Sequence, residues 1–151
     1  MMRETITAAM KDALKARDAA RTQTLRLISA AIKDREIALR GEGKGEITDE
    51  DILGLLQKMV KQREESAAIY AQNARPELEA KERAEIAIIQ EYLPKGLSED
   101  EVEAAIRDAI AETGAEGVKD MGRVIGVLKG KYPGRIDFGA ASRQVKAALG
   151  G

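Results

Sequence analysis

Apolar residues recur every three or four positions along most of this chain, which is the spacing of an amphipathic helix. Runs of β-branched residues are few, and the helix-favouring Ala, Leu, Glu, Lys and Arg are abundant. The apolar stripe of the first predicted helix is Ile6, Met10, Ala13 and Leu14. The second helix is predicted over about 19–40, and its stripe is Leu25, Ile28, Ile32 and Leu39. Five residues from Gly41 to Gly45 then break the pattern and predict a loop.

Two later helix starts carry a capping box, in which an N-cap hydroxyl and an acidic side chain three positions later accept free N–H groups of the first turn. Thr48 and Asp51 form one such pair, and Ser98 and Glu101 form the other. Between them, Pro76 suits the first turn of a fourth helix. The predicted apolar stripe of the third helix is Ile52, Leu55, Leu56, Met59 and Val60. The stripe of the fourth helix, which Pro94 ends, is Leu78, Ile86, Ile89 and Leu93.

The best domain boundary is Lys95-Gly96, which lies between Pro94 and the second capping box. We therefore predict an all-α protein, with an antiparallel N-terminal helical bundle over residues 1–94 and a small three-helix C-terminal domain over residues 98–151. Asp137 is the predicted N-cap of the last helix. The stripe of that helix is Ala141, Val145, Ala148 and Leu149.

In the middle helix of the predicted C-terminal domain, a glycine recurs at every fourth position. Met121, Val124, Ile125 and Leu128 mark the buried face, so Gly122, Gly126 and Gly130 fall on nearly the opposite side. Local backbone reasons account for the ends, with Gly122 in the first turn and Gly130 and Gly134 as cap and turn residues. Gly126 has no such local role. The alternative explanation for the row of glycines is a smooth face on which a partner or a nucleic-acid backbone docks.

Charge is unevenly divided in the C-terminal third, although the chain as a whole carries a net charge of −1. Carboxylates dominate residues 98–116 and cations dominate the residues after Gly117. Acidic and basic helices that pack side by side would neutralise each other, but a basic surface for an anionic partner fits equally well. The candidate RNA-binding residues on this surface are Lys119, Gly122, Arg123, Gly126, Lys129, Lys131 and Arg135.

A second candidate surface is a polar groove on the third predicted helix. Lys58, Gln62 and Ser66 are four residues apart and line one ridge. The candidate groove residues are Lys58, Lys61, Gln62, Arg63 and Ser66. The alternative interpretation is an amphipathic boundary whose long cationic stems cover apolar surface.

The chain lacks Cys and His, which excludes disulfides, zinc thiolate sites, a thiol nucleophile and the commonest general base. None of the four serines lies in a nucleophile motif. We therefore predict no catalytic, cofactor-binding or metal-binding residues. No run is long enough to span a membrane, and the charged start is unlike a secretory signal, so we expect a soluble cytoplasmic protein without membrane contacts.

Four ordered motifs, at 25–37, 58–66, 85–94 and 120–126, resemble the signatures of the GatB/YqeY family from end to end of the chain. The resemblance implies a stand-alone version of the tail domain of the B subunit of glutamine-dependent tRNA amidotransferase. That tail helps to hold tRNA, and the catalytic parts of the enzyme lie elsewhere, so the resemblance supplies no catalytic residue. The implied partners are tRNA and an aminoacyl-tRNA-handling enzyme.

Three hypotheses of function follow. The first is a non-catalytic tRNA-binding or tRNA-enzyme adaptor. The second is an accessory component of the glutamine-dependent tRNA amidotransferase, a carbon–nitrogen ligase that takes its amide from glutamine. The third is a protein–protein adaptor that docks through the groove on the third helix and does not bind RNA.

Overall fold

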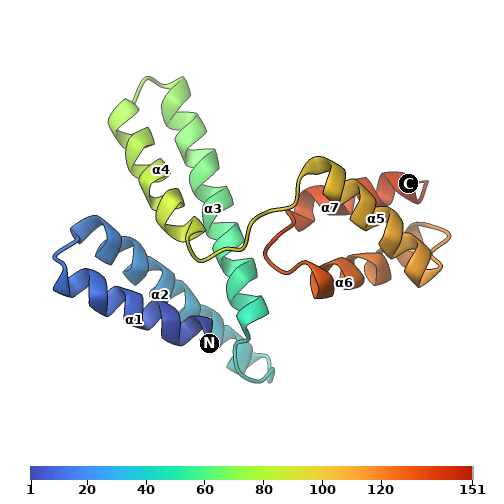
Figure 1. Cartoon of the computed structure of the whole chain (residues 1–151), viewed down its shortest axis with the longest axis horizontal. Coiled ribbons are helices and arrows are strands. Elements are labelled where there is room, and N and C mark those ends of the chain that lie inside the picture. The colour runs from blue at the N-terminus through green and yellow to red at the C-terminus, as the bar shows by residue number, and fades with distance from the viewer. Residues whose placement is uncertain (151) are drawn as a thin grey trace. The chain divides into compact units, whose positions relative to one another are not determined.

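The computed structural model describes residues 1–150, and its regular structure is helical throughout that range, which confirms the predicted all-α class (Figure 1). The helices are α1 (Met2–Lys15), α2 (Ala19–Gly41), α3 (Asp49–Gln72), α4 (Pro76–Gln90), α5 (Glu99–Thr113), the 3-10 helix η1 (Val118–Asp120), α6 (Met121–Lys131) and α7 (Phe138–Ala148). Contacts divide the chain into two units, Met1–Leu93 and a second that begins at Pro94. Residue 151, at the end of the predicted C-terminal domain, lies outside the described residues.

The N-terminal unit consists of two helical hairpins, α1 with α2 and α3 with α4 (Figure 1). Helix α2 also packs against α4, and α1 against α3, so that the hairpins share one apolar core. The large side chains with less than 2% of their surface exposed in this core are Ile6, Leu25, Ile28, Ile52, Leu56 and Ile89. Each belongs to a stripe predicted from the sequence.

Both hairpins turn through a residue in the left-handed conformation that is not glycine. Arg17 follows α1 with φ of 58°, and Ala74 follows α3 with φ of 53°. After Ala74, the N–H of Arg75 donates to the Tyr70 carbonyl at 2.9 Å, while that of Ala74 itself donates to Ala71 at 3.4 Å. This pair of bonds is the Schellman motif, whose left-handed position is usually occupied by glycine because glycine has no Cβ to clash.

Both predicted capping boxes are confirmed. The Asp51 N–H donates to the Thr48 hydroxyl at 3.1 Å, and the Thr48 N–H donates to the Asp51 carboxylate at 3.0 Å. The same reciprocal pair joins Ser98 and Glu101 at the start of α5. An N-cap of this kind typically stabilises a helix by about 1 kcal/mol, so local sequence determines where these two helices begin.

Three positions of the predicted stripes are exposed in the structure. Leu14 and Leu78 expose 48% and 44% of their surface, because they lie in the last turn of α1 and the first turn of α4, where no other hairpin covers them. Ala148 is exposed at the end of α7. Helix α4 also ends at Gln90, earlier than the predicted stop at Pro94.

The C-terminal unit packs α5, α6 and α7 around a small core in which Val124, Leu128 and Val145 are fully buried. Asp137 caps α7 as predicted, because its carboxylate accepts the Gly139 N–H at 3.0 Å. The chain that leads into α5 is part of this unit. The Leu97 N–H donates to the Arg135 carbonyl, and Arg135 Nε donates to the Lys95 carbonyl, both at 2.9 Å.

Candidate functional site

The glycines of α6 line an open face of that helix. Gly122, Gly126 and Gly130 are exposed, and a Cβ added to any of them would meet no heavy atom of the described residues within 4 Å outside the local backbone. Val124 and Leu128 are fully buried on the other side, as the periodicity predicts. The glycines thus leave the α6 backbone accessible from outside the C-terminal unit.

The structure tests the local backbone role predicted for each of these glycines. Gly122 lies in the first turn of α6, as predicted, and Gly134 has φ of 75° in the turn after the helix. The prediction that Gly130 caps the helix is wrong, since α6 continues to Lys131 and the capping N–H is that of Tyr132. Gly130 therefore lies in the last turn of α6, and Gly126 stands inside an exposed helix, where it costs about 1 kcal/mol relative to alanine.

Arg123 and Lys131, two of the candidate RNA-binding cations, already have partners within the C-terminal unit. Arg123 donates to the Asp120 carboxylate at 2.7 Å and to the Thr113 carbonyl at 3.1 Å. Lys131 pairs with Glu112 of α5 at 2.5 Å. The Arg123 and Lys131 side chains remain 59% and 50% exposed, and ion pairs at such exposure contribute little to stability. Both cations are therefore exposed but already engaged by carboxylates of the same unit.

The Asp120 carboxylate is held in its ionised form. The Glu116 N–H donates to it at 3.0 Å, and this bond together with the Arg123 guanidinium lowers the Asp120 pKa to about 2. At neutral pH the negative charge of Asp120 consequently offsets the positive charge of Arg123. The positive potential at this end of α6 depends more on the neighbouring lysines than on Arg123.

Lys119 and Lys129 are the more available cations of this set. Both side chains are exposed, and within residues 1–150 neither has an ion pair. Lys129 lies 5.8 Å from the centre of the Phe138 ring, a weak cation–π contact. Arg135, in contrast, is half-buried and holds the Lys95 carbonyl, which is a structural role.

On α3, the structure separates Arg63 from the rest of the predicted groove. Lys58, Lys61 and Gln62 are exposed and Ser66 is half-buried. Arg63 faces α4, where its Nε donates to Glu85 at 2.9 Å and its Nη1 donates to the Met59 carbonyl at 3.2 Å. Only 15% of the Arg63 side chain and 14% of the Glu85 side chain are exposed. Arg63 thus joins the two helices of the hairpin.

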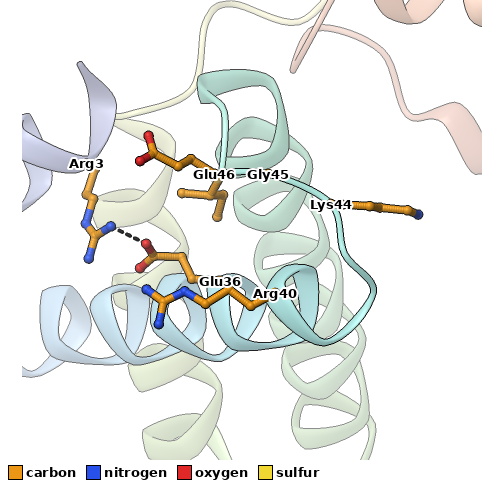
Figure 2. Close-up of a pocket in the computed structure, with 7 residues that line it drawn as sticks. Arg3, Glu36, Arg40, Lys44, Gly45 and Glu46 are labelled. Carbon is orange, nitrogen blue, oxygen red and sulfur yellow. Dashed lines mark hydrogen bonds and ion pairs between the residues drawn. The ribbon is translucent and has the colours of Figure 1, made fainter.

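A pocket with a volume of about 430 Å³ was missed by the sequence reasoning (Figure 2). It lies where the start of α1, the end of α2 and the following loop meet, and its lining residues are Arg3, Glu36, Arg40, Lys44, Gly45, Glu46 and Ile47. Arg3 and Glu36 form an ion pair across it. The available sequence signal was the run of cations seven residues apart in α2, which ends at Arg40.

Among residues 1–150 no helix is long and apolar enough to cross a membrane, and no group of acidic side chains is arranged to hold a metal ion. The candidate groups on α6 and α3 are exposed cations and glycines.

The family model for Yqey-like proteins matches residues 3–149, and the chain belongs to this family. This match confirms the resemblance carried by the four sequence motifs.

Three yeast proteins, each named "Altered inheritance of mitochondria protein 41, mitochondrial", are similar to this chain. That of Saccharomyces cerevisiae (strain YJM789) is 33% identical over 84 residues, which cover 56% of this chain and 44% of the yeast protein. Those of Lachancea thermotolerans and Vanderwaltozyma polyspora are 32% and 29% identical over 68% and 74% of this chain, and over 54% and 62% of their own lengths. The chain thus spans about half the length of these relatives.

Proposed function

We propose that this protein is a non-catalytic adaptor that holds tRNA on the open face of α6. The α6 surface consists of Lys119, Gly122, Arg123, Gly126, Lys129, Lys131 and Arg135. The observation that supports the proposal is the row of exposed helical glycines flanked by lysines without ion pairs. Glycines let a ligand backbone come close to the helix, and lysines attract phosphate groups.

The cost of the glycines favours this proposal over a purely structural role. Gly126 and Gly130 fit no turn or close packing within the described residues. Because alanine at position 126 would stabilise the helix by about 1 kcal/mol, the smooth surface fits a helix that contacts a partner. An aminoacyl-tRNA-handling enzyme is the second partner that we propose for the adaptor.

The experiment that tests the proposal is titration of the full chain with a tRNA transcript at several salt concentrations. The charge-reversal variant is Lys119→Glu/Lys129→Glu, which leaves the contacts of Arg123 with Asp120 and Thr113 in place. The matched control is Arg75→Glu/Lys81→Glu, with Arg75 at the N-cap of α4 and Lys81 within that helix, and both residues are exposed. Removal of two phosphate contacts should lower the log–log salt slope by about two, and the control should bind as the unmodified chain does.

Gly126 allows a second test that separates binding from folding. Gly126→Ala and Gly126→Leu should both stabilise the helix by about 1 kcal/mol, because nothing described obstructs the added side chain. Gly126→Leu should weaken tRNA binding more than Gly126→Ala, since only the longer side chain keeps a backbone away. Full affinity in Gly126→Leu and in the charge-reversal variant would reject the α6 surface.

A further inference from the structure

Helix α2 carries a row of cations with no partners of their own. Arg26, Lys33 and Arg40 are exposed, and within residues 1–150 their side chains have no hydrogen bond or ion pair. They are seven residues apart and therefore share one helix face, with about 10.5 Å between neighbours along the axis. We call these three residues the basic stripe.

The charge around the basic stripe is positive and is not balanced locally. Residues 1–44 hold ten Lys and Arg against six Asp and Glu, whereas residues 45–93 hold six against eleven. Of the nearest acidic residues, Glu36 lies beside Lys33 and Arg40 on the helix but is already engaged. Glu36 is paired with Arg3 and its side chain is only 11% exposed, and Asp34, one residue after Lys33, points about 100° around the helix.

The basic stripe leads into the pocket beside Arg3. Arg40 belongs to both, and the pocket lining holds two more cations, Arg3 and Lys44, with the carboxylates of Glu36 and Glu46. Lys44 is paired with Glu42 at 3.2 Å. Figure 2 shows the Arg3 and Arg40 guanidinium groups on either side of the Glu36 carboxylate. Arg3 neutralises that carboxylate, so Arg40 keeps its charge for a ligand.

The surroundings of the stripe favour a nucleic acid over a membrane or a protein partner. A membrane-binding helix needs an apolar face to insert, but the apolar face of α2, which includes Leu25 and Ile28, is buried in the core. Protein interfaces deplete lysine and use aromatic anchors, whereas the exposed large apolar residues beside the stripe are the aliphatic Leu27 and Ile37, 40% and 56% exposed. Nucleic-acid interfaces are strongly positive and polar, as this stripe is.

We propose that the basic stripe and its pocket form a second RNA-contacting surface, which belongs to the N-terminal unit and binds the phosphate backbone through Arg26, Lys33 and Arg40. The inference takes its RNA ligand from the proposed function but does not depend on the α6 surface. Because the contacts are to phosphates, the stripe adds affinity without selecting a sequence.

The test is titration of the full chain with the same tRNA transcript between about 50 and 200 mM salt. The variant is Arg26→Glu/Lys33→Glu, and Arg75→Glu/Lys81→Glu is again the control with an equal change in charge. Two lost phosphate contacts should reduce the log–log slope by about two and weaken binding about 10- to 100-fold at about 0.1 M salt. Circular dichroism should show unchanged helicity, because both stripe side chains are exposed.

The outcomes separate this inference from the proposed function. Loss of binding in the stripe variant with full binding in Lys119→Glu/Lys129→Glu would support the stripe and reject the α6 surface, and the reverse pattern would reject the stripe. An equal loss in the control would mean that only net charge matters, which also overturns the inference. If poly-glutamate of matched length displaced tRNA from the stripe as well as unlabelled tRNA does, an acidic protein would replace RNA as the ligand.

Discussion

The ion pair between Arg63 and Glu85 should hold the α3–α4 hairpin together, and a double-mutant cycle measures by how much. Both side chains are more than four-fifths buried, and Arg63 has one further bond, to the Met59 carbonyl. We consider the single variants Arg63→Met and Glu85→Leu and their combination. Each single change leaves the other charge between the two helices without its partner.

The expected magnitude lies between two limits. Breaking a fully buried pair costs about 3–5 kcal/mol, and an exposed pair contributes about 0.2–1 kcal/mol. Because 15% and 14% of the two side chains remain exposed, each freed charge keeps some access to water, and we expect each single variant to lose about 2 kcal/mol. The double variant, which replaces the pair by apolar side chains, should lose about 1 kcal/mol or less. The coupling energy is then about 3 kcal/mol.

The assay is urea unfolding, with tyrosine fluorescence as the reporter. The chain has no Trp and three Tyr, of which Tyr70 and Tyr92 lie in the N-terminal unit. A Tyr132→Phe background therefore makes the signal specific for that unit. If the double variant lost the sum of the two single losses, the coupling would be zero. Arg63 would then act as an independent surface cation and would return to the candidate groove.

Two further predictions concern single residues. Ala74→Gly should stabilise the N-terminal unit by about 0.5–1 kcal/mol in urea unfolding, because glycine relieves the left-handed strain at φ of 53° and this gain exceeds its extra unfolded-state entropy; a loss of stability would show that the turn is unstrained. Asp120, with a folded pKa of about 2 against an ordinary 3.8, should contribute stability to the C-terminal unit that is complete above about pH 4 and is lost as pH falls toward 2. Asp120→Asn should flatten this part of the pH–stability profile measured by circular dichroism, and an identical acid profile in both proteins would contradict the assignment.

Local signals in the sequence predicted helix starts well and long-range pairing poorly. Thr48, Ser98 and Asp137 were identified because an N-cap bonds to residues two or three positions away. The Arg63–Glu85 pair joins residues 22 positions apart on different helices, so no spacing rule predicts it. For the same reason the sequence pattern of α3 places Arg63 in a groove that it does not share.

In the candidate site, too, the local features were predicted and the long-range contacts were not. The periodicity of α6 predicted that Val124 would be buried and Gly126 exposed, and both are. The sequence could not show that Lys131 pairs with Glu112, 19 residues earlier, while Lys129 does not. The net charge of −1 gives no sign of the α2 stripe, because the opposite charges of the two hairpins cancel in it.

The hydrogen bonds between Arg135 and the chain before α5 bear on how the C-terminal unit is isolated as a fragment. A fragment that begins at Ser98 retains the capping box but loses the Leu97 N–H and the Lys95 carbonyl, which bond to Arg135. It also loses the Leu97 side chain from the small apolar core. A fragment that contains this unit should therefore start at Pro94 or earlier, and limited proteolysis should spare the Lys95–Leu97 peptide bonds.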